Sequence, residues 1–150
     1  TVIPVEVPTH VNGILQFENG AVGTITTTFD VYYDRQDKLE IYGSEGTLRV
    51  PDPNGFGGSV MLLRPENGQF REIPLLFDYA ENSRGLGLAD MAKALRTGRD
   101  ARADVQQTLH VLEIMTAIEK SSQEGRYVSL STSYERRPAM TRQPVKGILD

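Results

Sequence analysis

The sequence predicts an α+β fold: an open, mainly antiparallel β-sheet with two helices packed on one face. Residues 9–75 contain short runs rich in β-branched residues, separated by turns that carry glycine. Beyond residue 85 the hydrophobic period changes from two to about 3.6 residues, as expected for helices. A chain of 150 residues is long enough to bury one core without disulfides or metals.

The first two strands are expected at residues 10–17 and 21–29, joined by Glu18-Asn19-Gly20. Asn-Gly favours a tight hairpin because both residues tolerate a positive φ angle. A second pair is expected at 38–43 and 47–50, around Gly46, and a third at 59–64 and 70–75. Sequential strands with such short links favour one antiparallel sheet.

Two helices are expected next, at residues 86–97 and 103–124. Gly98 and Gly125 stand where helices often end in a left-handed residue. The pattern predicts an inward apolar stripe on each helix: Leu88, Met91, Ala92 and Leu95 on the first, and Val105, Leu109, Leu112, Met115 and Ile118 on the second. A short last strand is predicted at 127–130, and an extended or loose tail at 131–150.

Composition excludes several classes of partner. The net charge is −4 and no segment concentrates Lys or Arg, so we expect no nucleic-acid partner. The chain has no cysteine, which excludes disulfides and thiolate metal sites and is compatible with a cytoplasmic protein. No apolar run is long enough to cross a bilayer, so no membrane partner is expected. The chain begins within a strand-like run and without Met, which suggests a piece excised from a longer protein.

No complete catalytic or cofactor-binding motif can be assembled from the residues. Gly85 and Gly87 form a Gly-x-Gly, but no βαβ unit surrounds them, so we expect them only to permit the turn into the helix. His10 and His110 are expected to be hydrogen-bonded packing residues, and no metal-ligand spacing is present. The sequence therefore assigns no catalytic, cofactor-binding or metal-binding residue.

Two polar loops are the candidates for a ligand site. They combine aromatic rings with charged donors, as sugar-binding surfaces do, and five residues are predicted to border a substrate pocket: Tyr32, Tyr33, Arg35, Tyr79 and Arg84. The alternative is that loop 32–35 is a solvated connection whose tyrosines cover a sheet edge, and that loop 77–84 is a surface crossing.

Five segments in order resemble the carboxyl-terminal domain of the Gfo/Idh/MocA family of glucose-fructose oxidoreductases and inositol dehydrogenases. They are residues 15–24, 39–48, 88–96, 110–115 and 121–122 with Gly125, and the resemblance covers residues 10–130. It implies that residues 1–130 form a substrate and oligomerisation domain beside an amino-terminal Rossmann domain that binds NAD or NADP. It also implies hydride transfer to or from a sugar, cyclitol or similar polyol. The family's catalytic lysine and acid–His pair match no residue of this chain.

The first predicted hairpin carries a Thr-rich face, formed by Thr24, Thr26 and Thr28, that is a candidate for homo-oligomer contact. The alternative is a plain solvated sheet face. Two other functional classes stay open: a binding or dimerisation domain without a redox role, and an unrelated antiparallel α+β scaffold. An upstream Gly-x-Gly-x-x-Gly segment in the parent gene would favour the oxidoreductase.

Overall fold

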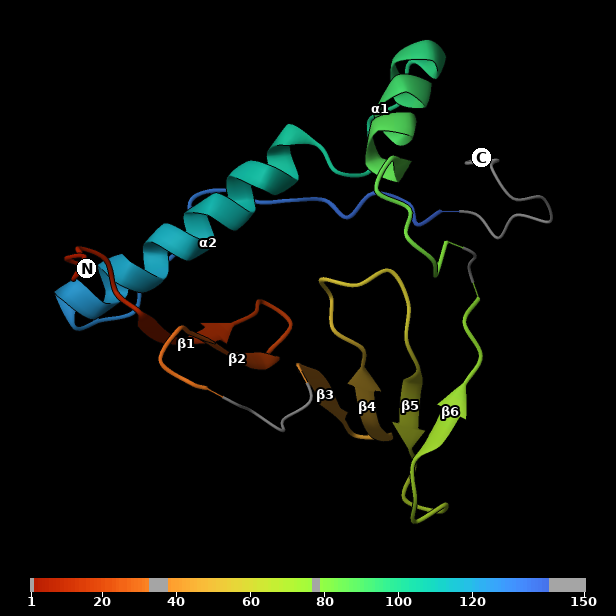
Figure 1. Cartoon of the computed structure of the whole chain (residues 1–150), viewed down its shortest axis with the longest axis horizontal. Helices are drawn as coiled ribbons and strands as arrows, with labels where there is room; N and C mark the ends of the chain where they lie inside the picture. Colours follow the sequence, from red (N-terminus) through yellow and green to blue (C-terminus); the bar gives the residue numbers. More distant parts are fainter. Residues whose placement is uncertain (1, 33–37, 77–78, 141–150) are drawn as a thin grey trace. The chain divides into compact units, whose positions relative to one another are not determined.

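A computed structural model describes residues 2–32, 38–76 and 79–140 of the chain. The chain separates into two compact units, Thr1–Gln36 and Asp37–Asp150, and each is described by itself. The elements (Figure 1) are β1 His10–Gln16, β2 Val22–Thr28, β3 Leu39–Gly43, β4 Gly46–Val50, β5 Val60–Leu63, β6 Arg71–Ile73, α1 Leu86–Thr97 and α2 Val105–Glu124.

The first unit is the predicted β-hairpin. Strands β1 and β2 pair antiparallel in an unbroken register from His10↔Thr28 to Gln16↔Val22. Its turn is closed by the amide of Gly20, which donates to the carbonyl of Phe17 at 2.9 Å. Residues directly opposite each other share a face of a sheet, so Thr24, Thr26 and Thr28 lie on one face with Ile14, Asn12 and His10.

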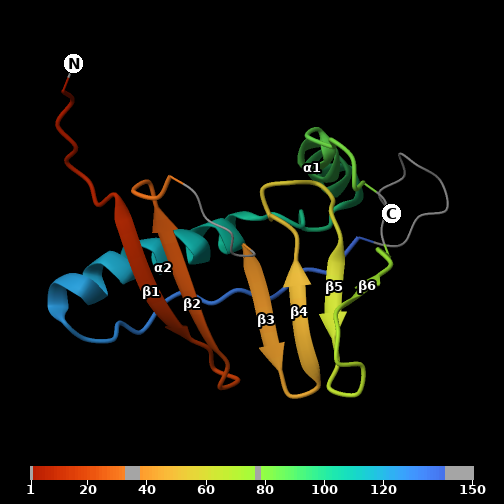
Figure 2. The same cartoon turned by 60° about the horizontal axis from the view of Figure 1, so that its bottom comes forward.

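The second unit contains a four-stranded antiparallel sheet in the order β3-β4-β5-β6 (Figure 2). The register divides its side chains between two faces of different chemistry. One face is apolar except for Arg71, with Leu39, Ile41, Leu48, Val50, Val60, Leu62 and Ile73. The other face is mixed, with Glu40, Tyr42, Thr47, Arg49, Met61, Leu63 and Glu72. On the mixed face the Arg49 guanidinium contacts Glu40 at 2.9 Å and lies 4.1 Å from the centre of the Phe70 ring.

Gly46 allows the β3–β4 turn to lie directly against β5. Its φ angle is 155°, and a Cβ atom built there would stand 2.2 Å from the Leu63 carbonyl oxygen. Any side chain would therefore force the turn away from the strand and disturb the β4–β5 ladder. Close approach of another backbone is one of the reasons for a glycine inside a sheet.

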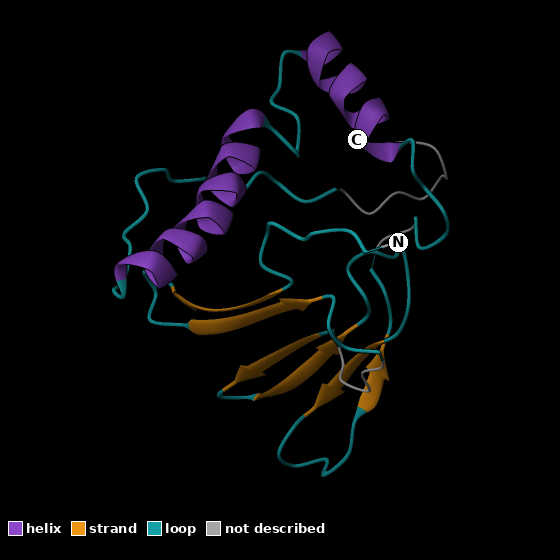
Figure 3. Ribbon diagram, turned by 60° about the vertical axis from the view of Figure 1, so that its left-hand side comes forward, coloured by secondary structure: helices purple, strands orange, loops and turns teal. Residues whose placement is uncertain are grey.

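The two helices agree closely with the sequence prediction (Figure 3). Both end at a left-handed glycine, Gly98 with φ 72° and Gly125 with φ 62°. Asp104 immediately precedes α2, and its carboxylate accepts a hydrogen bond of 2.8 Å from the Gln107 amide. This is the arrangement of an N-cap, which satisfies a backbone donor at the start of a helix.

The α+β class with antiparallel strands is confirmed, but the strands do not form one sheet. In the described residues they form a two-stranded sheet, β1-β2, and a four-stranded sheet, β3-β4-β5-β6. The physical reason lies in the connection. Short turns with glycine fix the register of a hairpin, whereas the sequence between β2 and β3, residues 29–38, contains no glycine turn.

The predicted inward stripes of the helices are largely exposed. Leu95 of α1 is 82% exposed and Val105 of α2 is 79% exposed. The two buried residues of α1 are instead Asp90 and Ala94, one turn apart on another face. Residues 127–130, predicted as a strand, have no strand structure, because their neighbours Ser131 and Thr132 hydrogen-bond to a side chain of α2 and not to a sheet.

Candidate functional site

The loop from Tyr79 to Arg84 leads from the four-stranded sheet into α1 and has a defined local structure. Tyr79 has a φ of 71° and is the one non-glycine residue with positive φ in the part of the chain that the structure describes. For an ordinary side chain this conformation costs about 1–2 kcal/mol. Further along, the Ser83 hydroxyl donates to the Glu81 carbonyl at 3.0 Å, and the Leu86 amide donates to the Ser83 carbonyl at 2.9 Å.

The five predicted pocket residues fall into three groups. Tyr79 is half-buried and Arg84 is exposed, and both lie in this loop of the second unit. Tyr32 belongs to the first unit and is fully exposed. Tyr33 and Arg35 lie outside the described residues, as do Phe77 and Asp78 of the second predicted loop. The structure thus brings Tyr79 and Arg84 into one loop, and their role in binding stays a prediction.

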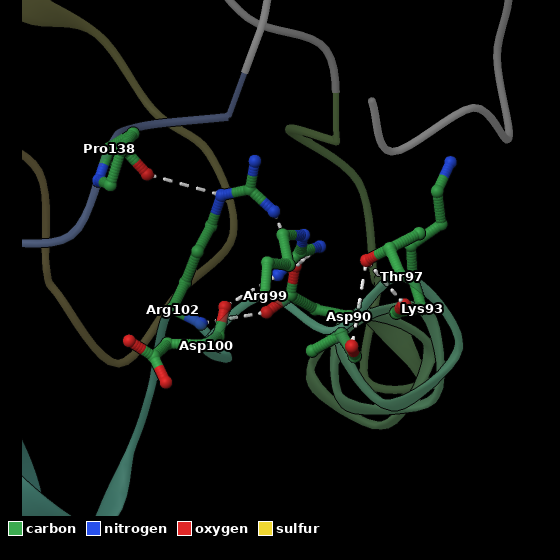
Figure 4. Close-up of polar contacts among 8 residues, drawn as sticks. Asp90, Lys93, Thr97, Arg99, Asp100, Arg102 and Pro138 are labelled. Carbon is green, nitrogen blue, oxygen red and sulfur yellow. Dashed lines mark hydrogen bonds and ion pairs between the residues drawn. The ribbon is translucent and has the colours of Figure 1, made fainter.

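Asp90 of α1 is the centre of a polar network (Figure 4). Its carboxylate accepts hydrogen bonds from Arg99 Nη2 at 2.7 Å and from the Arg102 amide at 2.9 Å, and it pairs with Arg102 Nη1. The Asp90 side chain is only 9% exposed. Burial alone would raise the pKa of Asp90, but the hydrogen bonds from Arg99 and Arg102 outweigh it and hold the pKa at about 2.

A second group of charges attaches the carboxyl-terminal segment to the α1–α2 connection. Arg137 contacts Asp104 at 2.7 Å through Nε and Asp100 at 3.0 Å through Nη1. Arg102 Nε also donates to the Pro138 carbonyl at 3.2 Å (Figure 4). Hydrogen bonds from the Gln107 amide and then from Arg137 lower the pKa of Asp104. Ion pairs and this hydrogen bond therefore connect α1, the start of α2 and residues 137–138.

Glu113 of α2 makes a second attachment to the same segment. Its two carboxylate oxygens accept four hydrogen bonds, from the amide and hydroxyl of Ser131 and the amide and hydroxyl of Thr132, at 2.5–2.8 Å. The hydroxyl of Thr132, then Ser131, holds the pKa of Glu113 at about 2. His110 Nδ1 lies 2.8 Å from Thr132 Oγ1. Because that hydroxyl donates to Glu113, it accepts from the His110 N–H.

These networks are suited to holding the chain and not to acid–base chemistry. A general base works best with a pKa near the working pH, whereas Asp90 and Glu113 have pKa values of about 2. Among residues 2–32, 38–76 and 79–140, no group of three or more His, Asp or Glu side chains could hold a metal ion. No helix in the described part of the chain is long and apolar enough to cross a membrane.

The described residues also do not fit a nicotinamide cofactor. Dinucleotides bind where a glycine turn joins a parallel strand to a helix N-terminus. Here the Gly85-x-Gly87 turn follows an irregular segment, and the sheet that precedes it is antiparallel. Gly85 has an ordinary helical φ of −77°, and a Cβ atom at either glycine would meet nothing within 4 Å. The sequence suggested that these glycines permit the turn into α1, but the turn does not require glycine at either position.

Comparison with known proteins identifies the family. Residues 6–130 match the model of the Gfo/Idh/MocA oxidoreductase family, C-terminal alpha/beta domain. The chain belongs to the Gfo/Idh/MocA oxidoreductase family. No curated protein and no solved structure matches the chain.

The match confirms the resemblance drawn from the sequence motifs. It spans both sheets and both helices, so all the described elements belong to the Gfo/Idh/MocA domain. It ends at Leu130, just before Ser131 and Thr132, which bind Glu113. The carboxyl-terminal attachments therefore join residues inside the matched domain to residues beyond it.

Sequence reasoning missed the residues of both networks. One signal was present: the segment Arg99-Asp100-Ala101-Arg102-Ala103-Asp104 alternates charges within a short helix connection, where ion pairs can form with a preceding helix. Glu113 lies one turn from His110 in the sequence of the second predicted helix and has no other distinguishing feature there. Its partners Ser131 and Thr132 are 18 and 19 residues distant in sequence, and no local pattern joins them.

Proposed function

We propose that this chain is the substrate-facing domain of an NAD- or NADP-dependent oxidoreductase that acts on a sugar, cyclitol or similar polyol. The observation that carries the proposal is the match of residues 6–130 to the carboxyl-terminal domain of an oxidoreductase family. In this proposal the cofactor is bound by a Rossmann domain outside residues 1–150, since the described residues do not fit a dinucleotide. The cysteine-free composition supports a cytoplasmic setting.

The loop from Tyr79 to Arg84 supports a polyol as substrate. A tyrosine ring can lie against the C–H face of a sugar, and its hydroxyl can donate or accept a hydrogen bond. A guanidinium offers several fixed donors to neighbouring hydroxyl groups. Tyr79 and Arg84 place both kinds of group in one loop whose Ser83 turn is defined by hydrogen bonds.

The direct test uses the full-length protein that carries this domain. Reduction of NAD and of NADP is followed spectroscopically with a panel of sugars, cyclitols and linear polyols. We expect turnover with at least one member and a clear preference for one cofactor. Absence of both turnover and calorimetric binding across the panel would reject the proposal.

Alanine substitutions then test the five predicted pocket residues, Tyr32, Tyr33, Arg35, Tyr79 and Arg84. Loss of one hydrogen bond or ring contact should raise KM roughly tenfold. Arg96→Ala is the matched control for Arg84→Ala, because Arg96 is an exposed arginine in the last turn of α1. Unchanged kinetics in all five variants would remove these residues from the substrate site.

A further inference from the structure

The unusual conformation of Tyr79 needs a physical cause outside the loop itself. A tyrosine with a φ of 71° persists only when its surroundings prevent relaxation to negative φ. Such residues concentrate at ligand-binding sites, where the strained backbone fixes the direction of a side chain. The structure therefore has to contain a contact that fixes residues 79 and 80.

That contact comes from the connection between β4 and β5, which Figure 2 shows as the loop joining these two strands. A Cβ atom built at Gly57 would stand 2.4 Å from the Ala80 carbonyl oxygen and 3.2 Å from the Ala80 side chain. The backbone at residue 57 thus lies directly against the residue that follows Tyr79. Any residue other than glycine at position 57 would force the Ala80 carbonyl to move.

The connection is itself held in place on its other side. Gly58 has a φ of 116°, and a Cβ atom there would stand 2.6 Å from the Pro51 side chain. The Asp52 carboxylate accepts a hydrogen bond of 2.8 Å from the Asn54 amide, and the Asp52 carbonyl accepts one of 2.9 Å from Gly55. Residue 57 consequently belongs to a tightly turned segment and forms a firm support for Ala80.

We propose that Gly57 is a positioning residue for the loop from Tyr79 to Arg84. Its contact with Ala80 holds Tyr79 in the left-handed conformation and so sets the direction of the Tyr79 side chain toward a hydroxyl-bearing substrate. The β4–β5 connection thereby contributes to substrate specificity, although it supplies no group that touches the substrate. This inference rests on the proposed function for the role of Tyr79, while the support of the loop by Gly57 stands on the geometry alone.

The test compares Gly57→Ala with Gly87→Ala in the full-length protein. Both add one methyl group, but a Cβ atom at Gly87 would meet nothing within 4 Å. In Gly57→Ala we expect a KM for the polyol raised roughly tenfold with kcat changed less than about twofold, as for a loss of binding energy that the ground state and the transition state share. Gly87→Ala should keep both constants.

Two further measurements separate the possible failures. Amide hydrogen exchange at residues 79–84 should become faster in Gly57→Ala and not in Gly87→Ala, and equal exchange would overturn the support by Gly57 even if the protein turns over no polyol. Tyr79→Asn keeps a residue that tolerates left-handed φ but removes the ring. It covers the case in which Gly57→Ala does not fold. An unchanged KM in Tyr79→Asn would overturn the role of Tyr79.

Discussion

Asp90 is a single side chain that fixes the connection between α1 and α2 through its contacts with Arg99 and Arg102. It is a nearly buried carboxylate with two arginine partners, so its charge is compensated where it lies. Removing one member of such a group lowers the stability of the fold, because the remaining charged side chains stay buried without their partner. Asp100, by contrast, is 66% exposed and contacts Arg137 near the surface.

We expect Asp90→Asn to lower the free energy of unfolding by about 3 kcal/mol, at the lower end for a broken buried pair because Arg99 and Arg102 are 28% and 22% exposed. Asp100→Asn, the matched control, should change it by less than about 1 kcal/mol. Urea unfolding followed by circular dichroism gives both values. Equal effects of the two substitutions would contradict the central role of Asp90.

The pKa values of Asp90 and Glu113 predict loss of stability in acid. Both pKa values are about 2 in the folded chain and therefore lie below those of the unfolded chain. The unfolded state then binds more protons, so the contribution to stability is complete above about pH 5 and is lost as the pH falls toward 2. Unfolding midpoints measured from pH 7 to pH 2 should fall most steeply in this range.

Glu113→Gln should make this pH dependence shallower, because the substituted side chain no longer titrates. Glu119→Gln is the control, since Glu119 accepts a hydrogen bond from Gln123 within its own helix and does not hold the carboxyl-terminal segment. That variant should keep the slope of the wild-type chain. A slope that Glu113→Gln leaves unchanged would assign the acid sensitivity to other groups.

At the scale of elements, local chemistry predicted most of the fold. Asn19-Gly20, Gly46, Gly98 and Gly125 mark turns or helix ends that follow from the residues themselves, and α1 begins and ends where the pattern placed it. The division into two sheets depends on a longer link without turn chemistry, so the sequence could not predict it. The apolar period of α1 likewise did not indicate that Asp90 would lie on its buried face, where it pairs with Arg99 and Arg102.

The candidate site was predictable only in part, for the same reason. The composition of the predicted loop 77–84 indicated a ligand loop. The left-handed φ of Tyr79 and the approach of Gly57 to Ala80, however, depend on two segments more than 20 residues apart. Propensity rules describe neighbours along the chain and not such contacts. Tyr79 and Arg84 could therefore be named from the sequence, whereas the support behind them could not.

The Thr-rich face of the first hairpin gives a prediction at this scale. Thr24, Thr26 and Ile14 share this face, and all three are exposed. We expect the chain to self-associate through it, since a sheet face can pair with an identical face about a two-fold axis. Thr26→Glu should shift sedimentation toward the monomer by placing like charges in the contact.

Thr27→Glu is the matched control for this experiment. Thr27 is also exposed, but it lies on the opposite face of the hairpin, across from Val11. It should leave the association state of the chain unchanged. A wild-type chain that stays monomeric at high micromolar concentration would exclude the interface.

At the scale of the whole molecule, residues 1–150 should bind neither NAD nor NADP tightly. Tight binding of the pyrophosphate needs a glycine turn between a parallel strand and a helix, and the turn before α1 follows an irregular segment. Calorimetric titration of the chain, with circular dichroism to verify its folding, tests this beside the full-length protein. Low-micromolar binding by residues 1–150 would show that Gly85 and Gly87 have a role in cofactor binding.

The close contact of Gly46 with Leu63 also limits how this domain can diverge. In a saturation library selected for folded protein, every residue other than glycine should be depleted at position 46, including alanine. The oxygen 2.2 Å from a built Cβ is the backbone carbonyl oxygen of Leu63, which cannot move away as a flexible side chain could. Gly68 has a φ of 64° but open space around a built Cβ, so asparagine should survive there. Selection at position 46 thus reports on the packing of the turn against β5 and is independent of substrate or cofactor.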